Sequence, residues 1–479
     1  MLFNSLTFIV FFLGVIAVNR RLGHGAQNRF LLVASYVFYG WWDYRFLALI
    51  LFSTAVDYYC AGRIHAAVDK SAKKRFLALS VLVNISSLGF FKYFNFFADS
   101  VVDLFALIGF QPDPFTLNII LPVGISFYTF QSLSYTIDVY RGELEPADDF
   151  FDFALYVSFF PQLVAGPIER ATTLLPQIQR HRSVSLTDIY EGLALISVGF
   201  VKKLVIADRC GPVVATAFDG PVIAGNGAEA WTFLYLFAFQ IYGDFSGYSD
   251  IARGCSRILG FDLVRNFGRP YFVTNPSAFW RHWHISLSTW IRDYIYIPLG
   301  GNGSGIGMTF RNLLLTMFLG GLWHGAGWAY ALWGVYHGVL LIFYRVIDLV
   351  NPLRGGDSPN AIVAGVSNFA ATIIFFHFTC IGWLLFRTGA LSSDYSQLGF
   401  LANSFPLLFK MPDLNVVAPL LRLVAVMFLL VAALQVLGGT LESTVAKRPR
   451  LGIGLLATCW LLVLSFGVFN GAEFIYFQF

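Results

Sequence analysis

The apolar residues of this chain fall in long continuous runs and do not alternate with polar residues. In lipid every backbone polar group must be satisfied within its own element, so membrane spans are helices or closed barrel strands. Continuous runs favour helices over strands of alternating faces. We therefore predict helices over Leu2–Val18, Phe30–Tyr59, Phe76–Phe97, Leu117–Phe130, Phe150–Val164, Ile189–Phe200, Trp231–Tyr242, Leu313–Trp323, Trp328–Tyr344, Val366–Phe386, Val416–Leu437 and Leu451–Val468.

Several of these runs are shorter than the ~20 residues that a helix needs to cross a bilayer. Short runs with polar flanks are stable only inside a protein-lined interior or as re-entrant pieces. The sequence therefore predicts an all-α polytopic membrane protein with about 10–12 membrane helices, including short re-entrant ones, around a central tunnel.

The composition excludes a soluble protein and several other classes. Hydrophobic residues make up 57% of the 479 residues and charged residues 13%, against about 25% charged in soluble domains. The formal net charge of +4 is too small and too dispersed to indicate nucleic-acid binding. The five cysteines are scattered and form no C-x-x-C pair, so we interpret them as buried apolar residues and not as a disulfide or zinc framework.

The basic loops predict how the chain is oriented. A break at Trp41–Arg45 divides Phe30–Tyr59 into a helical hairpin, which places the basic loops Arg20–Arg29 and Arg63–Arg75 on one side. The positive-inside rule makes that side cytoplasmic. No Lys or Arg precedes Arg20, so the basic region of a cleavable signal peptide is missing and the first run is expected to be retained.

No repeat or low-complexity segment divides the chain. We therefore expect one membrane domain over residues 1–479, with core motifs within 121–338 and C-terminal helices and a tail within 366–479.

Ionisable residues gather between residues 121 and 338, among short apolar runs. Such groups are costly at membrane depth, so they face a cavity or pair with one another and often mark function. The set comprises Asp138, Arg141, Glu169, Arg170, Asp244, Asp250, Arg281, His282, His284, Asp293, His324 and His337.

The segment Asn275–Gly301 is the first of two that stand out. Asn275-Pro276 is a plausible helix entry, and Trp280, His284, Ser288 and Ile291 then recur on one helical face. His282 and His284 diverge by about 200° on a helix, so both cannot face one cavity centre, and periodicity does not decide between them. No carboxylate or Cys lies at a matching spacing, so we predict no metal site.

The second segment is Gly320–Gly338, where His324 lies between Trp323 and Gly325 in an apolar stretch. The glycines at 320, 321, 325 and 327 permit close backbone approach. A neutral imidazole in a dry tunnel suits a general base for a hydroxyl, although a buried hydrogen-bonded core histidine is the alternative. His337 fits a structural role better.

At these residues the sequence resembles the membrane-bound O-acyltransferase superfamily, and most of all its bacterial branch that O-acetylates cell-envelope polysaccharides such as alginate, bacterial cellulose or peptidoglycan. The motifs that carry the resemblance, in family order, are Pro122–Gln131, Phe159–Arg170, Asp244–Asp250, Asn266–Phe267, Arg269–Tyr271, Trp280–His284, Gly321–Gly325 and the C-terminal Phe474–Phe479. His282 stands where an Arg is usual, and no basic residue follows Gly300-Gly301-Asn302.

The resemblance implies an O-acetyltransferase of the bacterial inner membrane. It implies that His324 is the catalytic histidine and His284 its partner across a tunnel. The donor would be cytoplasmic acetyl-CoA, with no permanently bound cofactor, and the acceptor an exported or cell-envelope polysaccharide. A secreted or membrane-tethered acetyltransferase, similar to a serine esterase, is the expected partner.

Two other functions are weighed. D-alanyl transfer to teichoic acids is the related enzymatic alternative. A transporter of an acyl donor or glycan without chemistry would also fit short broken helices with central charges, but it predicts an internal repeat that the chain does not show.

The C-terminal tail offers one hydroxyl. The basic residues at Lys447–Arg450 precede the last apolar run, so the positive-inside rule puts Phe474–Phe479 outside the cytoplasm. A phenol can form a covalent ester intermediate, and in similar proteins this motif is thought to carry the acyl group. Tyr476 is therefore predicted to accept acetyl with His324 as base. The alternative is that these aromatic residues only anchor the chain at the interface.

Overall fold

The computed structural model describes residues 1–110, 116–164, 166–303, 305–350, 361–391, 397–410, 414–447, 449–469 and 474–475. In these ranges the regular structure is helical and no strand is present, which confirms the all-α prediction. The chain forms two compact units, Met1–Ile196 with Tyr248–Val264, and Ser197–Gly247 with Arg265–Phe479. The single membrane domain stays a prediction.

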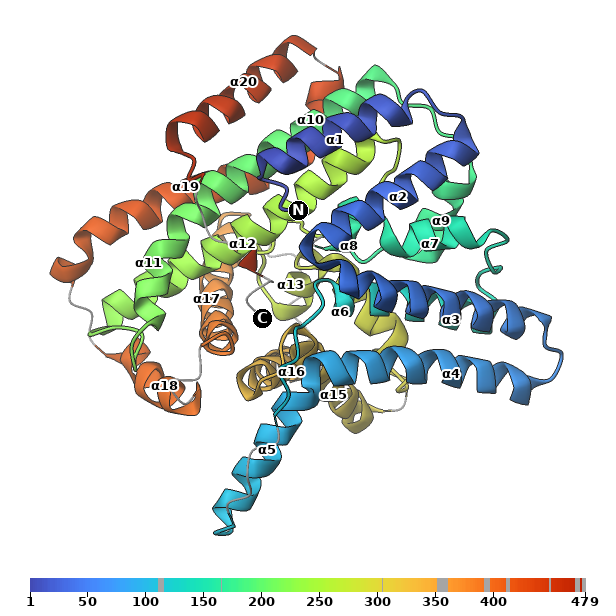
Figure 1. Cartoon of the computed structure of the whole chain (residues 1–479). Helices are drawn as coiled ribbons and strands as arrows, with labels where there is room; N and C mark the ends of the chain where they lie inside the picture. Colours follow the sequence, from blue (N-terminus) through green and yellow to red (C-terminus); the bar gives the residue numbers. More distant parts are fainter. Residues whose placement is uncertain are drawn as a thin grey trace. The chain divides into compact units, whose positions relative to one another are not determined.

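The first unit holds the N-terminal helices (Figure 1). Its elements are α1 (Leu6–Asn19), α2 (His24–Asp43), the 3₁₀ turn η1 (Tyr44–Phe46), α3 (Leu47–Ala66), α4 (Lys70–Leu88), the π-helix η2 (Gly89–Tyr93), α5 (Phe94–Leu107), α6 (Ile125–Arg141), α7 (Phe150–Ser158), α8 (Phe160–Leu163), α9 (Ala171–Gln179), most of α10 (Leu186–Phe200) and the end of α12 (Gly227–Ile258).

The predicted break between α2 and α3 is confirmed at η1, where the Asp43 carboxylate accepts the Arg45 backbone N–H at 2.9 Å. The two helices diverge from this turn instead of packing side by side (Figure 1). α3 pairs with α4 instead, through buried Asp57, which accepts hydrogen bonds from Ser80 at 2.5 Å and Asn84 at 2.9 Å.

Several predicted runs have different boundaries in the structure, and packing explains two of them. The predicted helix 117–130 is wrong at its start, because α6 begins at Ile125 after Gly124, whose φ is +77°. A Cβ at Gly124 would lie 2.7 Å from the Leu163 carbonyl oxygen, so both the φ and the contact require glycine. The run 150–164 is divided into α7 and α8, with the side chains of Phe153–Val157 at most 1% exposed. This short run lies in a protein-lined interior, as predicted.

The second unit holds the histidines singled out by the sequence. Its elements are the end of α10, the π-helix η3 (Val201–Ala207), α11 (Asp208–Phe218), α12 up to Gly247, α13 (Pro276–His282), α14 (Ile285–Ile291), the π-helix η4 (Arg292–Tyr296), α15 (Ile306–His324), α16 (Trp328–Val350), α17 (Ala361–Thr388), α18 (Gln397–Ser404), the 3₁₀ helix η6 (Phe405–Phe409), α19 (Leu414–Lys447) and α20 (Pro449–Phe466).

Glycines bring α15 and α16 together, as the sequence predicts. A Cβ on Gly321 would overlap the Tyr330 carbonyl oxygen and would lie 3.0 Å from Gly334. A Cβ on Gly325 would overlap the Tyr330 ring. The close approach fixes the end of α15, which carries His324.

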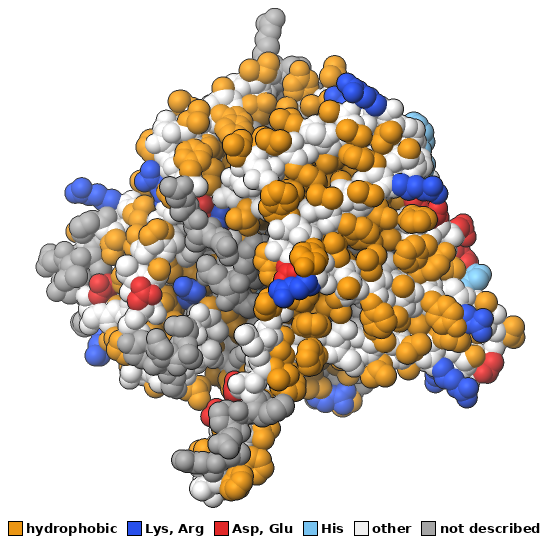
Figure 2. Space-filling model, in the orientation of Figure 1, with side chains coloured by type: hydrophobic (Ala, Val, Ile, Leu, Met, Phe, Trp, Pro, Cys, Tyr) orange, Lys and Arg blue, Asp and Glu red, His pale blue; other side chains and the backbone are white. Residues whose placement is uncertain are grey.

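Four described stretches are long and apolar enough to span a membrane: His24–Ala66, Lys70–Leu107, Trp328–Val350 and Gly365–Thr388. Leu6–Asn19, Leu420–Val436 and Leu451–Phe466 are shorter apolar helices. Figure 2 shows hydrophobic side chains over most of the drawn face and charged groups only here and there. Many of the exposed residues are large and apolar, such as Leu6 (75%) and Phe369 (69%), as expected of a surface in contact with lipid.

Candidate active site

His284 lies at a sharp corner between two short helices. The predicted continuous helix after Asn275 is wrong: α13 ends at His282, and His284 caps α14 with φ 42° and ψ 57°. His284 is the one non-glycine residue with positive φ in the described part of the chain. This left-handed conformation is strained for a residue with a Cβ, and such strain is concentrated at functional sites. The His284 side chain is fully buried.

His324 is the last residue of α15 and is 3% exposed. Three aromatic rings surround its imidazole: those of Trp333 at 5.0 Å between centroids, Trp323 at 5.1 Å and Phe386 at 5.2 Å. Each lies edge-on to it, with interplanar angles of 76–88°.

The structure brings the two predicted histidines together. Their ring centroids are 6.3 Å apart, and Trp323 lies against both rings. Phe245 packs edge-on against His284 at 4.6 Å. Burial lowers the pKa of His284, which lies outside the four candidate spans, to about 3. The site therefore holds two close, buried imidazoles enclosed by aromatic rings.

His282 faces a different environment. It is partly exposed, and its Nδ1 accepts the backbone N–H of Arg269 at 3.3 Å. Burial and three neighbouring arginines lower the pKa of its imidazole. Of the two histidines in Trp280–His284, it is therefore His284 that lies beside His324.

His337 packs within an aromatic cluster of the same unit. Its ring lies 4.9 Å from that of Trp333, 5.2 Å from that of Trp280 and 5.9 Å from that of Phe279. These contacts fit the structural role that the sequence favours.

Sequence reasoning missed a buried ionic cluster in the second unit. The Lys203 ammonium lies 2.7 Å from the Asp244 carboxylate and 2.9 Å from the Asp208 carboxylate. All three residues are at most 4% exposed. Asp244 was singled out by the sequence, but Lys203 was not. The signal was present: Lys202 and Lys203 interrupt the apolar stretch that continues after residue 200.

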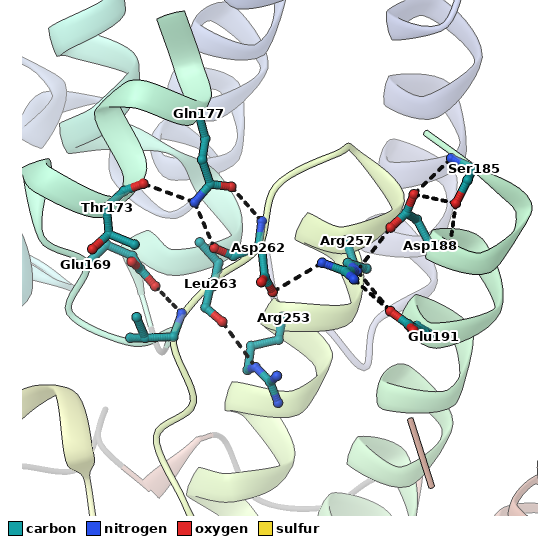
Figure 3. Close-up of polar contacts among 11 residues, drawn as sticks. Glu169, Thr173, Gln177, Ser185, Asp188, Glu191, Arg253, Arg257, Asp262 and Leu263 are labelled. Carbon is teal, nitrogen blue, oxygen red and sulfur yellow. Dashed lines mark hydrogen bonds and ion pairs between the residues drawn. The ribbon is translucent and has the colours of Figure 1, made fainter. Parts of the chain in front are cut away.

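The first unit holds polar networks of its own (Figure 3). Buried Glu169 accepts the Val264 backbone N–H at 2.6 Å, and Gln177 joins α9 to Asp262. Burial raises the pKa of the Glu169 carboxyl to about 8. Arg257 at the end of α12 contacts three carboxylates at 2.8–3.4 Å, those of Asp188, Glu191 and Asp262. These contacts tie the start of α10 and the loop before Val264 to the end of α12.

Two further predictions concern Tyr476 and metal binding. Tyr476 lies outside the described residues, but its neighbours Phe474 and Ile475 are described and are at most 2% exposed. Among the described side chains, no group of three His, Cys, Asp or Glu is arranged to hold a metal ion.

Comparison with known proteins decides the family. Residues 148–386 match the membrane-bound O-acyltransferase family model. The chain is 42% identical over 391 residues to the probable alginate O-acetylase AlgI of Pseudomonas aeruginosa, covering 81% of this chain and 72% of that protein. The chain belongs to the membrane-bound O-acyltransferase family.

Two other relatives have different names. The peptidoglycan O-acetyltransferase of Helicobacter pylori is 35% identical over 77% of this chain and 72% of its own length. The teichoic acid D-alanyltransferase of Bacillus subtilis is 28% identical over 58% of this chain and 71% of its own length. As a member of this family, the protein is a membrane-bound acyltransferase, which confirms the enzyme class predicted from the motifs.

Proposed function

We propose that the protein transfers acetyl groups from cytoplasmic acetyl-CoA across the bacterial inner membrane for O-acetylation of an exported or cell-envelope polysaccharide. The observation that carries the proposal is the buried pair His284–His324, enclosed by aromatic rings in a chain of this family. The names of its relatives, alginate O-acetylase and peptidoglycan O-acetyltransferase, support acetyl as the transferred group and a glycan as the final acceptor.

In this proposal His324 acts as the general base. It removes the proton of an acceptor hydroxyl while that oxygen attacks the acetyl carbonyl carbon of the thioester. The new C–O ester bond forms, the C–S bond breaks, and the CoA thiolate leaves and takes up a proton. The neutral form of the imidazole has a free nitrogen lone pair that can accept that proton. His284, 6.3 Å away, positions the acceptor.

We propose Tyr476 as the first acceptor. Its phenol would take acetyl from the donor, and a secreted or membrane-tethered acetyltransferase similar to a serine esterase would collect it for the polysaccharide. The buried position of Phe474 and Ile475 in the unit that holds both histidines supports this role.

The test replaces His324 with Gln in cells that acetylate their polysaccharide. We expect ester-bound acetate on the glycan to fall to background while the amount of protein in the membrane stays normal. His337→Gln is the matched control, because His337 is equally buried and also packs against Trp333. Normal acetylation in His324→Gln would refute the catalytic assignment.

Labelled donors separate the remaining functions. Vesicles supplied with acetyl-CoA labelled in the acetyl group should yield protein-bound label that requires His324. A transporter would move the donor into vesicles of the His324→Gln protein, and D-alanyl transfer would use an activated D-alanine instead.

Tyr476→Phe tests the relay, because it removes only the hydroxyl oxygen and keeps the aromatic ring. We expect glycan acetylation and labelling of the C-terminal peptide both to be lost. Wild-type acetylation in this variant would leave Tyr476 as an interfacial anchor.

A further inference from the structure

The buried cluster of Lys203, Asp208 and Asp244 takes no part in the proposed chemistry, yet the C-terminal tail reaches it. The Ile475 backbone N–H donates to the Asp244 carboxylate at 2.6 Å. The other oxygen of that carboxylate lies 2.7 Å from the Lys203 ammonium. A hydrogen bond to a charged acceptor inside a protein is stronger than one between neutral groups. We propose that Asp244, held by Lys203, is an intramolecular binding site for the C-terminal tail.

Two glycines allow α12 to approach η3 closely beside the cluster. Gly243 and Gly247 face η3 from α12: a Cβ on Gly243 would lie 2.8 Å from the Lys202 carbonyl oxygen, and one on Gly247 would lie 3.1 Å from the Lys203 nitrogen. Side chains at these positions would push α12 away from η3. The two glycines therefore bring Asp244 within reach of Lys203.

The π-helical turn supplies the second carboxylate. Lys203 and Asp208 are five residues apart and would diverge by about 140° on an α-helix. A π-helix closes its hydrogen bonds between residues five apart, and here the Asp208 N–H donates to the Lys203 carbonyl. The ammonium and the Asp208 carboxylate therefore meet at 2.9 Å.

The chain after α20 has a second attachment to the same turn. The Val468 N–H donates to the Leu204 carbonyl at 3.0 Å. The chain after α20 is thus held at two points. Val468 is bound to Leu204, the neighbour of Lys203, and Ile475 is bound to Asp244, the ionic partner of Lys203.

The described part of the docked tail, Phe474 and Ile475, lies near His284. The ring of Phe474 is 6.0 Å from that of Phe245, and Phe245 is 4.6 Å from His284. Tyr476 follows Ile475 directly in the chain. Asp244 is therefore a positioning residue for Tyr476, and this second part of the proposal depends on the proposed acetyl relay.

The experiment uses the full chain in detergent and measures the tail and the reaction separately. Hydrogen exchange of the C-terminal peptide reports the Ile475 N–H, and carboxypeptidase digestion followed by intact mass reports access to the tail. Acetylation of the Tyr476 peptide by labelled acetyl-CoA reports the reaction.

Asp244→Asn and Asp208→Asn form a matched pair. Each neutralises one of the two carboxylates that lie beside Lys203, and both positions are buried, but it is Asp244 that accepts the Ile475 N–H. In Asp244→Asn we expect exchange at Ile475 and digestion past it to rise about tenfold or more, with tail acetylation falling by a similar factor. Asp208→Asn should keep both close to wild type.

A second pair removes the donor and leaves every charge in place. Ile475→Pro deletes the N–H, and Ile475→Ala keeps it. We expect Ile475→Pro to release the tail as Asp244→Asn does, and Ile475→Ala to keep it more protected. This pair keeps the inference testable if Asp244→Asn fails to fold.

Three outcomes would overturn parts of the inference. If Asp244→Asn and Ile475→Pro leave the tail as protected as in wild type, Asp244 is not its binding site. Equal release by Asp244→Asn and Asp208→Asn would make the cluster a structural ion pair without a specific tail site. A released tail whose Tyr476 peptide is acetylated as in wild type would keep the binding site and refute the positioning role of Asp244, while the relay and the requirement for His324 are judged by Tyr476→Phe and His324→Gln.

Discussion

At the scale of single residues, the backbone of His284 is as informative as its imidazole. Its φ of 42° is costly for any residue with a Cβ. The conformation turns the chain between α13 and α14, so that His284 lies beside His324 and His282 lies beside Arg269.

This strain predicts an unusual order of stability at position 284. Glycine tolerates the left-handed conformation and alanine does not, so His284→Gly should be more stable than His284→Ala by about 1 kcal/mol. In an ordinary helix the order is reversed. Thermal unfolding of the two purified variants measures this difference in stability. Both variants should lose acetyl transfer. A more stable His284→Ala would show that the corner is unstrained.

Buried Glu169 predicts a pH dependence of stability in the first unit. Burial raises the pKa of its carboxyl from 4.5 to about 8. Between these values the folded form holds a proton that the unfolded form has released, so this group's contribution to stability is lost as pH rises toward 8. Glu169→Gln keeps an acceptor for the Val264 N–H and does not titrate.

The measurement is the difference in apparent melting temperature between Glu169→Gln and wild type. We expect the melting temperature of Glu169→Gln to rise relative to that of wild type by several degrees as pH increases from 5 to 8, at about 2–4 °C per kcal/mol. A constant difference over that range would contradict a raised pKa.

At the scale of helices, the pair α15 and α16 shows how packing places a catalytic candidate. Gly321 of α15 is pressed against the Tyr330 carbonyl and Gly334 of α16. Gly320, its neighbour in the chain, has room for a methyl group. A Cβ there would lie 3.5 Å from the Ile291 side chain, which is an ordinary van der Waals contact. One added methyl group should therefore destabilise the protein at Gly321 and have little effect at Gly320.

Gly321→Ala should destabilise the protein by about 1–3 kcal/mol through overpacking, and should lower acetyl transfer because the end of α15 carries His324. Gly320→Ala should change stability by less than about 0.5 kcal/mol and keep activity. Thermal unfolding and glycan acetylation in parallel give both values. Equal effects of the two alanines would mean that the helices are farther apart than this packing requires.

The helices could be predicted from the sequence more reliably than their ends. Apolar runs located most of the long helices but not the short α9, α11 and α18. The predicted run 231–242 ended too early, because α12 continues to Ile258 through Asp244 and Ser246, which its helix neighbours bury. A prediction from hydropathy ends the helix where such polar residues begin. The prediction of α6 started too early for the opposite reason: Leu117–Val123 is apolar but irregular up to Gly124.

The candidate site was predictable in part. Rare histidines in apolar segments singled out His284 and His324, and the structure places them together. The break at His284 was not predictable, because it needs a left-handed residue that is not glycine. The partnership of Lys203 with Asp208 was also hidden, since a spacing of five suggests opposite faces of an α-helix.

At the scale of the whole molecule, the arrangement of basic loops predicts the topology. Arg63–Arg75 should be cytoplasmic, and the tail after the last apolar helix should lie on the other side. Alkaline phosphatase fused after Phe479 should be active and green fluorescent protein dark, whereas fusions within the loop after Ala66 should behave in the opposite way. Cytoplasmic behaviour of both fusions would contradict the tail's predicted place outside.

The attachment of the C-terminal segment also depends on the one extra residue that makes η3 a π-helix. Removing one residue between Lys203 and Asp208 would close the turn into an α-helix and leave the two charges four apart, a spacing at which α-helical ion pairs form. The Leu204 carbonyl, which now accepts from Val468, would then return to the regular ladder of the helix. The extra residue therefore behaves as an insertion that serves the C-terminal segment. In related chains, a one-residue gap opposite residues 201–207 would mark members whose C-terminal segment is anchored differently, even where both histidines are kept.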